Sequence, residues 1–121
     1  MGVGVNFAIA NDFLEATRKF NLLFEEDIDN FIWNYRECFG DAVSILTEID
    51  PYSDKIFSHN EIEKLLRAAK QLKKDTILNS LEKEFIKQNV NKNELIEFAN
   101  ALIIMCESAL KQHKTMISIG Y

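Results

Sequence analysis

The segment from Asn91 to Gln112 constrains the fold of this chain more than any other. Its apolar residues spread too far around a helical wheel for a surface helix, which buries only one face. They are Leu95, Ile96, Phe98, Ala99, Leu102, Ile103, Met105, Cys106, Ala109 and Leu110. Asn91 and Glu94 have the spacing of a capped helix start. We therefore predict a helix at the centre of the protein, with the other elements packed around it.

The composition fits a single, mostly α domain that covers residues 1–121. Four Gly and one Pro are too few for a β fold with many turns. Short, partly alternating apolar segments stand near the two ends, at Val3 to Ile9 and Thr115 to Tyr121, and strands this short need a partner. We predict a compact helical bundle with a small two-stranded sheet formed by the N- and C-terminal segments.

Helical spacing and capping signals place the remaining helices. Ser58 and Glu61 form a capping-box pattern, and Gly40 stands where a helix would end. Besides the central segment, the predicted helices run over Asp12 to Asn21, Phe24 to Phe39, Asp41 to Glu48, Ser58 to Leu72 and Thr76 to Gln88.

Charge is distributed unevenly along the chain. The net charge is −5, but residues 1–63 carry a net of −9 and residues 64–121 a net of +4. The basic stretch from Lys64 to Lys74 has no interleaved aromatic residue for stacking on bases, so we interpret it as a solvated face and expect no nucleic-acid partner. No segment resembles a membrane span or a signal peptide, so we expect a cytoplasmic protein without membrane contact.

No catalytic or metal-binding constellation emerges from the sequence. His59 and His113 have no companion nucleophile and orienting group at a recognisable spacing. His59 and Glu63 share a helix face, but nothing completes a set of metal ligands, so we interpret them as a surface pair. Cys38 and Cys106 have apolar neighbours and are expected to be buried free thiols. The sequence predicts neither an enzyme nor a cofactor or metal.

The only Trp is predicted to point away from the core face of its own helix. The apolar face of the Phe24 to Phe39 segment is centred on Ile28 and Tyr35. The residues left on the opposite side are Glu26, Asn30, Trp33 and Glu37. A Trp among carboxylates is typical of an interface anchor. Alternatively, a second layer of the fold covers it, and the sequence leaves both interpretations open.

The segment from Asp50 to Asp54, here called the DPYSD turn, joins two predicted helices. Pro51 fixes φ, and Asp50 can accept hydrogen bonds from the turn amides. Such a restrained turn could present Tyr52 and its carboxylates to a basic partner at a low ordering cost. It could equally be a structural turn, with Tyr52 packed against a helix and Asp54 bonded to the backbone.

Three stretches resemble a known family. IDPYSDKIFSHNEIEKLL, Ile49 to Leu66, resembles the Asp-Pro-Tyr-Gly-Asp-Thr-hydrophobic-Phe segment and following helix of small bacterial proteins, some of them encoded with toxins. KQHKTMISIGY, Lys111 to Tyr121, is similar to the end of those chains, and a helix ending in Phe-Gly precedes both. The chain departs at Ser53, where the family has Gly, and at Lys55, where it has Thr. In size and acidity it resembles immunity proteins of contact-dependent growth inhibition systems.

That resemblance implies tight binding to a cognate toxin domain, commonly a basic nuclease, whose active site or substrate surface is covered. We accordingly predict that a monomer of this chain neutralises such a toxin by steric and electrostatic occlusion. A self-associating helical scaffold or regulatory domain is the alternative. The predicted partner-binding residues are Glu25, Glu26, Asp29, Trp33, Glu37, Asp41, Asp50, Tyr52 and Asp54.

Overall fold

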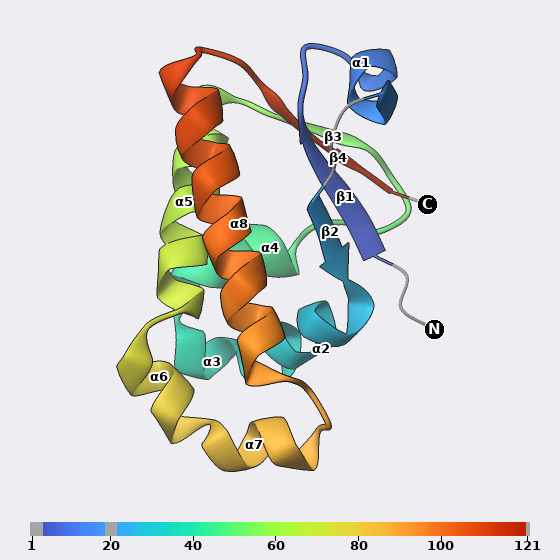
Figure 1. Cartoon of the computed structure of the whole chain (residues 1–121). Helices are drawn as coiled ribbons and strands as arrows, with labels where there is room; N and C mark the ends of the chain where they lie inside the picture. Colours follow the sequence, from blue (N-terminus) through green and yellow to red (C-terminus); the bar gives the residue numbers. More distant parts are fainter. Residues whose placement is uncertain (1–3, 19–21, 121) are drawn as a thin grey trace.

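The computed structural model describes residues 4–18 and 22–120. Within these ranges, an antiparallel sheet of four strands stands beside a group of helices that includes the long helix α8 (Figure 1). The strand order in the sheet is β2-β1-β4-β3. The strands are β1 (Gly4–Ile9), β2 (Leu22–Glu25), β3 (Lys55–Phe57) and β4 (Met116–Ile119).

Helices account for most of the chain that the structure describes, which confirms the prediction of a mostly α protein. They are α1 (Phe13–Arg18), α2 (Glu26–Asn34), α3 (Arg36–Phe39), the 3-10 turn η1 (Asp41–Val43), α4 (Ser44–Thr47), α5 (His59–Leu72), α6 (Asp75–Ser80), α7 (Glu82–Lys87) and α8 (Lys92–Lys111).

Helix α8 buries most of its wide apolar arc but leaves Glu97, Ile104 and Glu107 exposed, so the prediction of a central helix with the other elements packed around it is not confirmed. The helix packs along α5 on one side and faces the sheet on the other (Figure 1). Leu95, Leu102 and Cys106 are fully buried, and the Phe98 ring stacks on Phe24 of β2 with 4.8 Å between ring centroids. At its start, the Asn91 side chain accepts a hydrogen bond from the amide of Asn93. Helix α8 therefore connects the helical layer to the sheet.

The two terminal segments pair as predicted, but the sheet is larger than the sequence suggested. In the β1–β4 pair, Asn6 lies opposite Ile119 and Ile9 opposite Met116. The prediction of a two-stranded sheet is wrong, because β2 and β3 add one strand at each edge. These strands have four and three residues, too few to show a periodicity of their own. Val3 and Tyr121, the outer ends of the predicted strands, lie outside the described residues.

Three predicted helices have different boundaries in the structure. Phe24 is a strand residue opposite Val5 rather than a helix start, because pairing with β1 places its ring in the core equally well. The helix that follows breaks at Tyr35, and the predicted Thr76 to Gln88 helix breaks at Leu81. Helix α1 ends at Arg18, and residues 19–21 of its predicted range lie outside the described residues.

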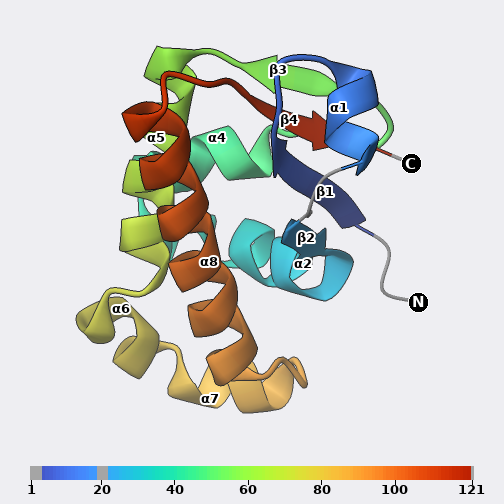
Figure 2. The same ribbon diagram turned by 45° about the horizontal axis from the view of Figure 1, so that its top comes forward.

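The sheet separates two apolar clusters. On the helical side, Phe7 and Phe57 belong to the main core with α2, α5 and α8. On the other side, Ala8 of β1 and Ile117 of β4 pack with Ala16 of α1, the helix that Figure 2 shows across the sheet from α8. Cys106 is buried as predicted, but the prediction of a buried Cys38 is wrong, because Cys38 is exposed. Cys38 lies on α3, and the break at Tyr35 rotates α3 relative to the single continuous helix that the prediction assumed.

Candidate partner-binding surface

A hollow of about 130 Å³ lies between the beginning of α2 and the DPYSD turn. Its apolar lining comes from Val5, Phe24, Ile49 and Pro51, and its polar lining from Glu26, Asp29, Asn30 and Tyr52. The predicted partner-binding residue Tyr52 is thus brought beside two others, Glu26 and Asp29, which lie more than twenty residues earlier in the sequence.

The local sequence explains why α2 presents carboxylates here. Its first turn contains Glu26, Asp27 and Asp29, and negative charge is favourable next to the unpaired amides of a helix N-terminus. Ile28 and Phe31 are buried on the core side. The opposite side therefore carries Glu26, Asp29, Asn30 and Trp33, at intervals of three and four residues; we call these four residues the α2 face.

The pKa of the Asp29 carboxylate on the α2 face is raised by its surroundings. The pKa of Asp29 is raised from 3.8 to about 6, first by burial and second by the neighbouring charge of Glu26. In the part of the chain that the structure describes, neither carboxylate forms an ion pair with a Lys or Arg. The hollow thus contains negative charge that is partly removed from water and that no Lys or Arg of the described residues pairs with.

Trp33 lies one turn farther along α2 and is 48% exposed. Its ring is not covered by a second layer of the fold, which answers one of the questions that the sequence left open. The guanidinium of Arg36 lies over the ring, 4.0 Å from its centroid, and also donates a hydrogen bond of 2.6 Å to the Trp33 carbonyl. Sequence reasoning missed Arg36, although its spacing of three residues from Trp33 places the two side chains on one helix face.

The other predicted carboxylates do not join the α2 face in one continuous patch. Glu37 and Asp41 are exposed and line a separate hollow with Arg36. Glu25 is exposed and alternates with buried Phe24 along β2, so it belongs to the opposite face of the sheet.

Asp50 and Asp54 form hydrogen bonds that shape the DPYSD turn. The Asp50 carboxylate accepts a hydrogen bond of 2.9 Å from the Tyr52 amide, and the Asp54 carboxylate accepts one of 2.9 Å from the Gly120 amide. The Tyr52 side chain is 75% exposed. Among the described residues, positive φ outside glycine occurs only at Asn89 and His113, so the Ser in place of the family's Gly is not strained.

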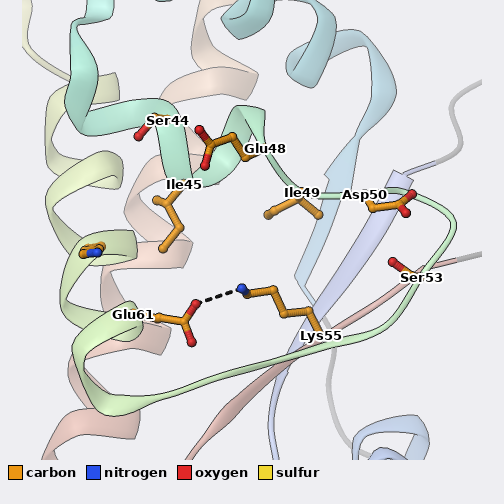
Figure 3. Close-up of a pocket in the computed structure, with 9 residues that line it drawn as sticks. Ser44, Ile45, Glu48, Ile49, Asp50, Ser53, Lys55 and Glu61 are labelled. Carbon is orange, nitrogen blue, oxygen red and sulfur yellow. Dashed lines mark ion pairs between the residues drawn. The ribbon is translucent and has the colours of Figure 1, made fainter.

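A larger hollow of about 340 Å³ lies on the other side of the DPYSD turn, between α4, β3 and α5. Figure 3 shows Lys55 extending from β3 across this hollow to Glu61 on α5, where their charged groups are 2.8 Å apart. This ion pair joins a Lys and a Glu of the hollow, which is also lined by Glu48, Asp50 and Lys64. We therefore place the candidate site on the α2 face, where the carboxylates have no such partner.

Within residues 4–18 and 22–120, no three His, Cys, Asp or Glu side chains are grouped to hold a metal ion. In the same ranges, none of the helices combines the length and apolar character needed to cross a membrane. Comparisons with protein-family models, curated proteins and solved structures found no match. The functional interpretation therefore depends on the geometry and charge of the surface itself.

Proposed function

We propose that this chain is a cytoplasmic immunity protein that binds and neutralises a basic antibacterial toxin domain. The observation that carries the proposal is the α2 face with Tyr52 beside it. Two carboxylates without ion pairs in the described part of the chain lie there between two exposed aromatic side chains, Trp33 and Tyr52. Aromatic anchors near the centre of an interface supply much of its affinity, and surrounding charge determines which partners approach.

The mechanism is occlusion of the toxin surface. A nuclease presents Lys and Arg side chains to the phosphates of its substrate, and carboxylates at matching positions compete for them. The hollow at Asp29 suits one such cation. Opposite charges attract each other more strongly where water is partly excluded, so the carboxylates gain most from a cation that binds inside the hollow. Tyr52 and Trp33 then contact the toxin on either side. The chain supplies no chemical step in this mechanism.

Charge reversal on the proposed surface tests this function. We expect the gene for a large secreted protein directly upstream, and its variable C-terminal domain is the toxin to express. The double variant Glu26→Lys, Glu37→Lys changes exposed residues and should lose growth protection on co-expression with that domain. The matched control, Glu97→Lys, Glu107→Lys, makes the same change in net charge on the exposed side of α8 and should protect like the wild type.

Full protection by the Glu26→Lys, Glu37→Lys variant would exclude Glu26 of the α2 face and Glu37 beside it as contacts of the toxin. The alternative function, a scaffold that self-associates through Trp33, also uses this exposed ring. Sedimentation of the purified chain separates the two functions. A monomer is expected for the immunity protein, whereas a dimer that resists salt and buries Trp33 supports the scaffold.

A further inference from the structure

Two segments that stand far apart in the sequence, the DPYSD turn and the C-terminal Ile119-Gly120, meet in the structure. The Gly120 amide donates its hydrogen bond to the Asp54 carboxylate at 2.9 Å. The backbone of the turn also lies against Gly120 so closely that a Cβ there would be 2.7 Å from the Pro51 carbonyl oxygen and 2.8 Å from the Ser53 amide nitrogen. Only glycine fits this contact without displacing the turn.

The C-terminal side of this contact is firmly held. Strand β4, which ends one residue before Gly120, pairs with β1 on one side and β3 on the other. The turn also restrains itself, since the Asp50 carboxylate accepts from the Tyr52 amide and the Asp50 carbonyl accepts from the Ser53 amide at 3.4 Å. The Asp54–Gly120 hydrogen bond therefore connects the exposed turn to the centre of the sheet.

We propose that Asp54 is a positioning residue for partner recognition, which together with Gly120 fixes the turn so that Tyr52 stays beside the α2 face. This inference rests on the proposed function. It changes the role predicted for Asp54: the residue holds the turn that carries Tyr52 in place and does not itself contact the toxin. Tyr52 lines the same hollow as Glu26 and Asp29, so a displaced turn alters the hollow itself. A protein whose binding-competent conformation is populated only in part binds with an affinity lowered by that fraction.

Two variants with the same net charge separate support from charge. Asp54→Asn retains a side-chain oxygen that can accept from the Gly120 amide, whereas Asp54→Ala retains none. We expect Asp54→Ala to weaken toxin binding by about 5- to 20-fold, since hydrogen bonds that involve a charged group are among the stronger ones. Asp54→Asn should remain within about twofold of the wild type at 0.5 M NaCl, where the effect of the lost charge is screened.

Equal weakening of both Asp54 variants would assign the residue a direct charge contact and overturn the proposal. Wild-type binding by both variants would overturn it as well. Gly120→Ala should weaken binding like Asp54→Ala. Because that variant could also fail to fold, the two Asp54 variants decide the question and its circular dichroism spectrum is recorded beside theirs.

Hydrogen exchange of the Gly120 amide tests the support without any partner. Exchange should accelerate at least about tenfold in Asp54→Ala and remain near the wild-type rate in Asp54→Asn. Unchanged exchange in Asp54→Ala would overturn the support. If the exchange behaves as expected but the wild-type chain binds no toxin domain, the support of the turn stands and the role in recognition falls with the proposed function. The two failures are therefore distinguishable.

Discussion

Asp29 carries a charge that folding alone does not favour. Its carboxylate is only partly exposed, and burial together with the nearby Glu26 raises its pKa to about 6. At neutral pH the folded protein therefore holds an ionised group that would be better solvated in the unfolded chain. Surfaces that bind other molecules often retain such groups at the expense of stability. In our proposal, a cation of the toxin compensates this charge in the complex.

Replacing Asp29 by Asn should stabilise the free protein at pH 7 and weaken its binding to the toxin. The pKa of Asp29 is higher in the folded state than in the unfolded state, so the folded state binds more protons between about pH 4 and 6. The wild type therefore becomes more stable as the pH falls through that range. Asp29→Asn should lose this pH dependence. At pH 7 its free energy of unfolding should rise by about 1 to 2 kcal/mol, less than the roughly 1.4 kcal/mol per pKa unit would give, because water screens this partly exposed carboxylate.

Urea unfolding at pH 4.5 and pH 7 measures the effect of Asp29→Asn. Asp27→Asn is the matched control, because it neutralises an exposed carboxylate on the same turn of α2 that does not line the hollow. If both variants change stability equally at pH 7, the hollow has no special effect on Asp29.

At the scale of elements, the start of α5 supports the site. Ser58 and Glu61 form the predicted capping box, in which the Ser58 side chain accepts from the Glu61 amide and the Glu61 carboxylate accepts from the Ser58 amide. Lys55 of β3 pairs with the same carboxylate, and this interaction, followed by the bond from Ser58, lowers the pKa of Glu61. One residue thus joins the helix start to the strand that follows the DPYSD turn.

Removing the cap side chain should therefore destabilise the whole domain. Ser58→Ala loses the hydrogen bond to the Glu61 amide, and the loss of such a cap costs about 1 kcal/mol. The measurement is the midpoint of urea unfolding. Ser53→Ala, at an exposed position in the DPYSD turn, is the control and should change the free energy of unfolding by less than about 0.5 kcal/mol. Equal effects would show that the capping box contributes little.

At the scale of the whole molecule, charge is divided unevenly between the two halves of the sequence. The first half of the chain carries a net charge of −9, and the second half +4. Among the residues that the structure describes, the basic side chains of α5 are directed to solvent at Lys64, Arg67 and Lys70, and the carboxylates of the α2 face pair with none of them. In our proposal, the carboxylates of the α2 face attract a basic partner during approach.

Added salt should slow association with the toxin domain much more than it speeds dissociation. Raising NaCl from 50 to 500 mM shortens the distance over which exposed charges act, so the association rate constant should fall by about tenfold or more. Stopped-flow fluorescence measures it, with Trp33, the only Trp of the chain, as the reporter on this side. An association rate that does not respond to salt would contradict electrostatic steering by the first half of the chain.

Local patterns in the sequence determined much of this protein. Spacing predicted three features: the wide apolar arc of α8, the capping residues Ser58 and Asn91, and the outward position of Trp33. These features depend only on neighbours within a turn or two of helix. The pairing of the two terminal strands also followed, since a short isolated strand requires a partner.

Tertiary structure alone decided which residues meet. Strands β2 and β3 are too short to be recognised before their partners are known, and Phe24 suits a helix or a strand until β1 pairs beside it. The grouping of Glu26 and Asp29 with Tyr52, and the engagement of Asp54 by Gly120, join segments distant in sequence. The physical reason is that a side chain's type and local spacing set its tendency to be buried or charged, whereas its neighbours depend on how the whole core packs.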